Sequence, residues 1–199
     1  MMSIEKHNPG VMTMAFSGPA WVSKFPTSSS LNDLTEPFRA SANRFVSALR
    51  SAGANVSISD TLRPPERAYL MHYCFAIARE GLDPGAVPPM TGVDIQWAHK
   101  NAAGTVDLAG SKAAAEQMVN GYGIVFKPVL NSRHTEGRAV DMDISWQASL
   151  VIAKADGSKQ TISSVPRTGA ENTDLHNVGA SYGVIKLLSD PPHWSSDGH

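Results

Sequence analysis

The chain has 199 residues, of which 42% are hydrophobic, enough to build one substantial hydrophobic core. Seventeen basic and eighteen acidic residues leave a net charge of −1, so the overall charge gives no support for binding to nucleic acid or to an anionic membrane. Cys74 is the single cysteine, which excludes an internal disulfide framework and a cysteine-based zinc site.

The first ten residues lack the basic start and the apolar run of a signal peptide. No segment approaches the ~20 consecutive apolar residues that a membrane helix needs. We therefore expect a protein that is made in the cytoplasm and is not inserted in a membrane. We also expect it to be a monomer. A target outside the cell would be reached after release by lysis or by a non-classical secretion route.

Apolar periodicity and the positions of glycine and proline predict the elements of the chain. In its first half we expect an irregular arm over 1–30, a helix over 31–49, a strand over 55–59, a helix from Pro64-Pro65 to Gly81 and an insertion over 82–110 that holds a short strand within 93–99. In its second half we expect a helix over 111–120, a strand over 139–144, a hairpin over 150–165, a helix over 173–182 and a strand over 184–187.

The expected strands are mostly late in the chain and are joined by short connections, which favours antiparallel pairing. Interspersed helices and antiparallel strands predict an α+β fold, with a small antiparallel sheet packed against several helices. We expect one domain over 31–199 after the arm. No glycine-rich phosphate loop follows any expected strand, so the sequence does not indicate nucleotide binding.

The segment from Asn131 to Asp143 places a histidine and carboxylates on either side of Gly137. Apolar and acidic residues alternate after Gly137, which predicts a strand with an acidic face that carries Asp141. His134 lies seven residues before Asp141, so a turn at Gly137 must bring the two side chains together. We interpret them as two ligands of a metal ion. The alternative is a surface histidine that precedes a strand with solvated acids.

A catalytic zinc site typically has three protein ligands, so a third is needed. His72 is expected to be a partly buried, hydrogen-bonded histidine, and His176 a solvated one. His99 could line a substrate groove. We favour His193, because Asp190 precedes it by three residues and the two intervening prolines exclude a helix and should hold the segment extended and stiff.

A hydrolytic site can be completed from the same region of the sequence. Zinc lowers the pKa of a bound water to about 7, and a carboxylate close by then acts as general base. Asp190 fits this role, and Arg63 is our choice for the cation that stabilises the oxyanion. The alternative for Arg63 is a salt bridge to Asp60 or Glu66.

These residues also resemble a known family. The motif Ser132-x-His134-x-x-Gly137-x-Ala139-x-Asp141, followed by Asp190-x-x-His193-Trp194, resembles the D-alanyl-D-alanine carboxypeptidase and L-alanyl-D-glutamate endopeptidase family of zinc peptidases. Ser59-x-Thr61-x-Arg63 is similar to the arginine-bearing segment of that family. The resemblance covers approximately residues 45–195.

The resemblance implies one zinc ion on the small sheet, bound by His134, Asp141 and His193. Asp190 would be the base and Arg63 the partner of the scissile carbonyl. It further implies that the bound partner is a peptidoglycan stem peptide, in which the enzyme cuts an amide bond.

Four other residues are expected to contact the substrate. Ser132 and Trp194 belong to the motifs, whereas Trp97 and His99 lie in the insertion, which the simplest family members lack. Many members carry glutamate where this chain has Asp190, and aspartate favours endopeptidase over carboxypeptidase activity. The alternatives are a non-catalytic zinc-containing module that binds the cell wall, and a zinc hydrolase acting on another substrate.

Overall fold

The structure, a computed structural model, describes residues 14–199, which form two compact units. The first unit contains residues 14–24 and 69–128, and the second contains residues 25–68 and 129–199. The described part of the expected arm is thus divided between the units, and the start of the arm, including Met1–Gly10, lies outside the described residues. The expected single domain over 31–199 is likewise divided.

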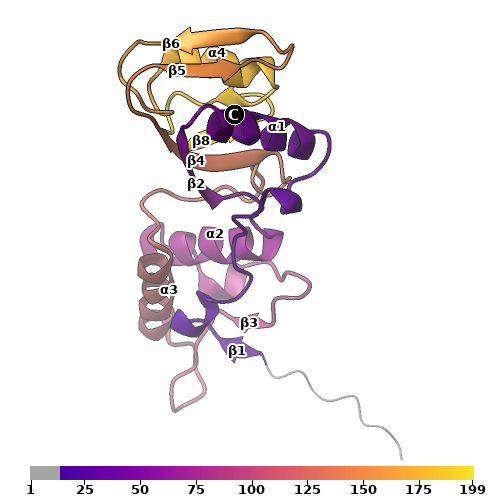
Figure 1. Ribbon diagram of the computed structural model, residues 1–199. Helices are drawn as coiled ribbons and strands as arrows, with labels where there is room; N and C mark the ends of the chain where they lie inside the picture. Colours follow the sequence, from indigo (N-terminus) through magenta and orange to yellow (C-terminus); the bar gives the residue numbers. More distant parts are fainter. Residues whose placement is uncertain (1–13) are drawn as a thin grey trace, which may run out of the picture. The chain divides into compact units, whose positions relative to one another are not determined.

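The described residues have an α+β fold with small antiparallel sheets, which confirms the predicted class (Figure 1). The α-helices are α1 (Phe38–Ser51), α2 (Pro65–Arg79), α3 (Leu108–Tyr122) and α4 (Thr173–Ser181). The strands are β1 (Ala15–Phe16), β2 (Asn55–Asp60), β3 (Ile95–Gln96), β4 (Ala139–Ser145), β5 (Leu150–Ala153), β6 (Lys159–Ile162), β7 (Ile185–Lys186) and β8 (His193–Ser195).

The first unit contains most of α2, the whole of α3, and a two-stranded sheet in which β1 and β3 pair in parallel. The sequence predicts a helix over 111–120, with Gly121 at its end. The helix, α3, instead continues to Tyr122 and ends at Gly123, whose φ of 67° is left-handed. Gly121 instead allows a close approach, because a Cβ there would lie 2.8 Å from a methyl group of Val22.

The second unit is built on a four-stranded antiparallel sheet with the strand order β2-β4-β8-β7. Helices α1 and α4 and the β5–β6 hairpin contribute to its hydrophobic core together with one face of this sheet (Figure 1). The largest fully buried side chains of this core include Phe45, Leu49, Met142, Leu175 and Trp194. The core therefore supports β4 and β8 from one side.

Two predictions about the elements of the second unit are wrong. The helix expected over 31–49 begins only at Phe38, because Pro37 has no N–H and disfavours helical geometry in the residue before it. Leu31–Asp33 forms a separate 3-10 turn. The segment before His193, expected to be extended, forms turns instead, and the three-residue strand β8 that follows it was not predicted.

The register of the sheet determines which side chains meet on its other face. Asp141 of β4 lies directly opposite His193 of β8, and Asp60 at the end of β2 pairs with Asp141 from the other side. Residues directly opposite in an antiparallel pair have Cβ atoms about 4.5–5.5 Å apart and share a face. The sheet thus brings Asp141 and His193 together although 52 residues separate them.

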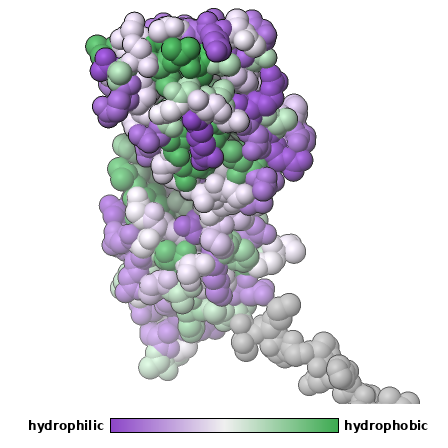
Figure 2. All heavy atoms as spheres, viewed as in Figure 1, coloured by the Kyte–Doolittle hydropathy of each residue, from purple (hydrophilic) through white to green (hydrophobic). Residues whose placement is uncertain are grey.

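The visible surface of both units mixes hydrophilic with hydrophobic residues (Figure 2). Large apolar side chains are exposed at several positions, among them Phe126 and Val125 in the first unit and Val151 in the second. None of the helices formed by residues 14–199 has the length and apolar character required to span a membrane.

Candidate metal centre

His134, Asp141 and His193 form one tight cluster in the second unit. The Nε2 atom of His134 lies 3.1 Å from Oδ1 of Asp141 and 3.1 Å from Nδ1 of His193. The third side of the triangle, from Nδ1 of His193 to Oδ1 of Asp141, measures 3.0 Å. Both histidines are buried and Asp141 is partly buried. The structure therefore brings together the three predicted ligands, and this group could hold a metal ion.

The spacing of the three atoms fits a small tetrahedral ion. Zinc bonds to histidine nitrogen and carboxylate oxygen are about 2.0–2.2 Å long, which places neighbouring ligand atoms of a tetrahedron about 3.3–3.6 Å apart. The observed edges of 3.0–3.1 Å are shorter by only a few tenths of an ångström. An ion can therefore be accommodated by a small outward movement of the three side chains.

Backbone carbonyls fix the orientation of both imidazole rings. Nδ1 of His134 lies 2.8 Å from the carbonyl oxygen of Thr61, and Nε2 of His193 lies 3.2 Å from that of His199. A carbonyl oxygen only accepts hydrogen bonds, so both of these nitrogens must be donors. The opposite nitrogen of each neutral ring then presents a lone pair to the cluster, as in histidines that bind metals.

The cluster consequently contains three acceptors and no proton between them when both rings are neutral. Nε2 of His134, Nδ1 of His193 and Oδ1 of Asp141 all direct electron pairs to the same small volume. Such a set is stable only when a proton or a cation neutralises it. This donor chemistry fits a divalent metal that prefers nitrogen and oxygen ligands.

The turn that carries His134 is fixed by its own side chains. Thr135 donates from Oγ1 to the carbonyl of Ser132, and its backbone N–H points to the hydroxyl of Ser132. Gly137 has the predicted positive φ, 66°, and its carbonyl accepts a hydrogen bond from the backbone of Thr35. A Cβ at Gly137 would lie only 3.0–3.1 Å from Thr35. Glycine is therefore required both for the turn and for this contact.

The pKa values of two cluster residues reflect their mutual contact. Burial alone would lower the pKa of His134, but the hydrogen bond and the charge of Asp141 outweigh burial and raise the pKa above its usual value. Burial alone would raise the pKa of Asp141, but the rings of His134 and His193, which donate to its carboxylate when they are protonated, hold that pKa far below its usual range. The metal-free cluster therefore keeps Asp141 ionised and favours the uptake of a proton by His134.

Proton uptake by His134 predicts how metal affinity depends on pH. A metal ion needs the neutral ring, so protons compete with it, and apparent affinity should fall as the pH drops through the pKa of His134. Because that pKa is raised, the decline should begin at a higher pH than for an ordinary histidine of pKa ~6.5. Zinc titrations by calorimetry between pH 5 and pH 8 in several buffers would measure this decline and the protons released. Affinity that stays constant over this interval would contradict the assignment.

Lys186 holds the loop that leads into His193. Its side chain is buried, and Nζ donates to the carbonyl oxygens of Leu187, Asp190 and His193. Burial lowers the pKa of Lys186, while the charges of Asp190 and Asp141 act in the opposite direction. The ammonium group thus uses all three donors on the backbone that carries Asp190 and His193.

Replacing Lys186 by methionine should destabilise the second unit. The change removes the lysine donor from three carbonyl groups, each of which keeps one backbone N–H donor. Hydrogen bonds from a charged group contribute about 1.5–3 kcal/mol each. We expect a lower free energy of unfolding in urea, measured on the metal-free protein, and weaker zinc binding in the folded variant. The exposed Lys100 provides the control, since Lys100→Met removes a charge without removing such hydrogen bonds. Equal stability of both variants would show that Lys186 has no role in holding this loop.

Arg63 and Asp190 are linked to ligand residues through the backbone, although their side chains are not part of the cluster. The backbone N–H of Arg63 donates to the carbonyl of His134 at 3.1 Å. Its guanidinium group makes a loose ion pair with Asp60 at 3.7 Å, and its buried Nε has no hydrogen-bond partner among the described residues. Asp190 is exposed, in the turn before His193, and its carbonyl accepts the backbone N–H of His193.

The four residues expected to contact the substrate do not lie together: two belong to the second unit and two to the first. Ser132 lies in the turn before His134, where it is hydrogen-bonded to Thr135. Trp194 is fully buried in the core, on the face of β8 opposite to His193, so its assignment as a substrate contact is wrong. Trp97 and His99 belong to the first unit. Trp97 is a core residue that donates to the hydroxyl of Tyr69, and His99 contacts the hydroxyl of Ser17 and the ring of Phe16.

The remaining histidines of the prediction are both hydrogen-bonded. His72 contacts the carbonyl of Pro128, which confirms its expected role as a partly buried, bonded residue. His176 is not simply solvated: Nε2 donates to the carbonyl of Gly169, and the ring packs edge-on against Trp194. Burial correspondingly lowers the pKa of His176. Its contact with Trp194 supports β8 from the core side.

Sequence reasoning missed three groups that shape the centre: the carbonyls of Thr61 and His199 and the ammonium group of Lys186. Every residue has a backbone carbonyl, so the sequence does not indicate which carbonyls will orient a histidine. Lys186 could have been noticed in the sequence, because a lysine within an apolar segment, Val184 to Leu187, is unusual.

No protein-family model matches the chain, and no curated protein matches it.

Proposed function

We propose that this protein is a zinc-dependent peptidase that hydrolyses an amide bond in peptidoglycan stem peptides. The observation that carries the proposal is the convergence of Nε2 of His134, Nδ1 of His193 and Oδ1 of Asp141 within 3.0–3.1 Å of one another. Three protein ligands are typical of catalytic zinc, because they leave a position for water or substrate. The resemblance of the motifs around these residues to the zinc peptidase family gives the substrate class.

When bound, zinc would act as a Lewis acid toward the scissile carbonyl and lower the pKa of water toward ~7. Asp190 would accept a proton from the attacking water and later deliver it to the leaving amine. Its backbone is held relative to His193 by two hydrogen bonds, one from Lys186 to the Asp190 carbonyl and one from the His193 N–H to the same oxygen. The base is thus presented by a loop with little freedom, as catalysis requires.

Arg63 would stabilise the negative charge that develops on the substrate oxygen. The hydrogen bond from its backbone N–H to the carbonyl of His134 keeps Arg63 beside the turn that carries this ligand. Its Nε has no partner among the described residues and could donate a hydrogen bond to a substrate. A guanidinium group is always charged and donates in a fixed geometry, which suits recognition of a carbonyl or carboxylate. The ion pair with Asp60 is long enough to be exchanged for a substrate contact.

The experiment is digestion of purified peptidoglycan by the purified protein, with mass analysis of the released fragments. We expect new amine and carboxyl ends at one peptide bond, loss of cleavage after chelation, and recovery on addition of one equivalent of zinc. We lean toward cleavage inside the peptide rather than removal of a terminal D-alanine. Cleavage that continues in excess chelator would contradict the proposal.

One observation favours a second candidate function, a zinc-containing module that binds the cell wall without cutting it. The carboxylate of Asp190 is exposed and is not among the groups that converge at the cluster. In that case the protein would bind zinc and sediment with peptidoglycan, yet release no fragments. The same digestion experiment distinguishes the two functions.

A further inference from the structure

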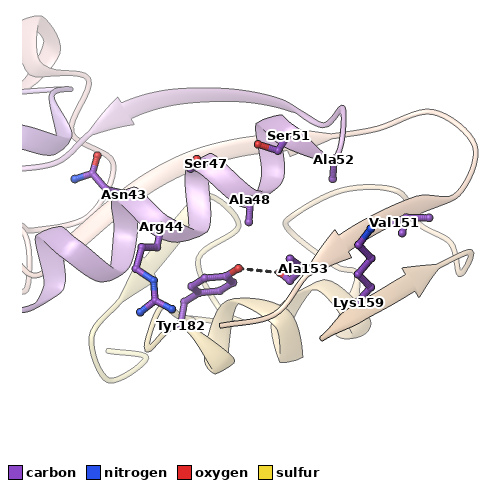
Figure 3. A pocket seen from close by; sticks show the side chains of 10 residues that line it. All are labelled: Asn43, Arg44, Ser47, Ala48, Ser51, Ala52, Val151, Ala153, Lys159 and Tyr182. Carbon is purple, nitrogen blue, oxygen red and sulfur yellow. Dashed lines mark hydrogen bonds between the residues drawn. The ribbon is translucent and has the colours of Figure 1, made fainter. Parts of the chain in front are cut away.

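The second unit also contains a concave site that does not include the three metal ligands. Helix α1 and the β5–β6 hairpin line an open groove of about 590 Å³, to which Tyr182 also contributes (Figure 3). None of His134, Asp141 and His193 lines it. Its volume is within the range of about 300–1,000 Å³ that is usual for small-ligand sites.

The charge of this groove is one-sided. Arg44 and Lys159 are among the side chains that line it, and no aspartate or glutamate is. The chain as a whole has nearly equal numbers of basic and acidic residues, 17 and 18. Asp156, in the hairpin turn, has its carboxylate occupied by the N–H and hydroxyl of Ser158. The lining thus combines two cations with no acidic side chain, although the charge of Asp156 reaches Tyr182 from outside it.

Arg44 is held in place at one end of the groove. Its guanidinium donates to the carbonyl of Ala155 at 3.0 Å and lies over the ring of Tyr182, 5.4 Å from the ring centre. Tyr182 is itself fixed, because its hydroxyl donates to the carbonyl of Ala153. Arginine has five donors, so this arrangement leaves several N–H groups for a ligand at a low cost in side-chain entropy.

Apart from the two cations and Tyr182, the lining side chains are small, and some of them are polar. Figure 3 shows Arg44 beside Tyr182 and Lys159 on the far side of Ala153. The rest of the lining consists of alanine side chains and the exposed Val151, with hydroxyl and amide groups contributed by α1. The polar residues are Asn43, Ser47 and Ser51. Methyl groups together with hydrogen-bonding groups match the side chains and amides of a peptide.

We propose that this groove binds a short acidic peptide, with one carboxylate at Arg44 and a second at Lys159. A planar guanidinium can bind a carboxylate through two parallel hydrogen bonds, and the lysine ammonium supplies a point charge at the other end. The site is independent of the metal centre, so its test can be made in the presence of chelator. The outcome then does not depend on whether the metal centre is catalytic.

The test is a nuclear magnetic resonance titration of the full chain with acetylated, amidated peptides in which one, two or three alanines separate two glutamates. We expect at least one of them to shift the amide signals of Ala48 and Ala153, and the corresponding glutamine peptide to produce no such shift. Arg44→Gln and Lys159→Gln should each weaken binding at least fivefold. The side chain of Lys159 makes no hydrogen bond or ion pair that the structure records among residues 14–199. Its pairing with Ala153 in the hairpin is through the backbone, so replacing the side chain should leave the fold intact.

Arg50→Gln is the matched control, because Arg50 is an exposed cation on the same helix that does not line the groove. The Arg50→Gln variant should bind the acidic peptide with the same affinity as the unmodified protein. The proposal is overturned if no acidic peptide binds at millimolar concentration, if the glutamine peptide binds equally well, or if Arg50→Gln weakens binding as much as Arg44→Gln does.

Discussion

Replacement of Asp141 by asparagine is expected to weaken zinc binding by about 10²–10³-fold and to abolish zinc-dependent cleavage. Zinc sites with four ligands bind with about 10–16 kcal/mol, or roughly 2.5–4 kcal/mol for each ligand, and each 1.4 kcal/mol corresponds to a factor of ten. Asparagine keeps the shape of the side chain but removes the negative charge, which is the only anionic ligand beside two neutral imidazoles in the cluster. Calorimetric titration of the metal-free protein with zinc measures the change.

The matched control for this variant is Asp143→Asn on the same strand. Asp143 is exposed, follows Asp141 by two residues and is not part of the cluster. It should bind zinc as tightly as the unmodified protein, and circular dichroism should show that both variants remain folded. Zinc affinity in Asp141→Asn within about threefold of the control would exclude Asp141 as a ligand, since three ligands of a small ion cannot be individually dispensable.

The second large effect is expected for Asp190→Asn, which should lower the rate of peptidoglycan cleavage by about 10²–10⁴-fold while zinc affinity stays unchanged. General acid–base catalysis by a positioned carboxylate contributes an acceleration of this size. Asparagine cannot accept a proton, but it preserves the backbone carbonyl that receives the bonds from Lys186 and His193. The initial rate of fragment release, measured with zinc-saturated protein, separates catalysis from metal binding.

Asp156→Asn is a suitable control for this rate, because Asp156 lies in the hairpin turn and asparagine can still accept hydrogen bonds from Ser158. Full activity in Asp190→Asn would remove Asp190 from the mechanism, while parallel loss of zinc and activity would show that the substitution disturbed the loop. A zinc-loaded parent protein that cuts no peptidoglycan would favour the wall-binding module.

The local parts of the metal centre could be predicted from the sequence, because their geometry depends on a few consecutive residues. The alternation after Gly137 predicted β4, and glycine itself predicted the turn that returns His134 to the face of Asp141. The order of helices and antiparallel strands was sufficient for the α+β class. These inferences rest on periodicity and on backbone conformations that few residues adopt.

Parts that depend on tertiary contacts were predicted less well. Trp194 was assigned to the substrate because it follows His193, but the register of β8 turns it into the core against Phe45. A strand of three residues is too short to show an alternation, so the face of each side chain could not be read from the sequence. The carbonyls that orient His134 and His193 come from Thr61 and His199, at positions that only the folded chain brings into contact.

X-ray absorption spectroscopy of the zinc-loaded protein is the measurement that tests the metal centre most directly. With one equivalent of zinc we predict nitrogen and oxygen neighbours at about 2.0–2.2 Å, a scattering pattern of two imidazole rings, and no sulfur neighbour at about 2.3 Å. Asp141→Asn should lose this spectrum at the same zinc concentration. A spectrum with a sulfur ligand, with other than two imidazoles, or with zinc surrounded by water alone would contradict a site formed by His134, Asp141 and His193.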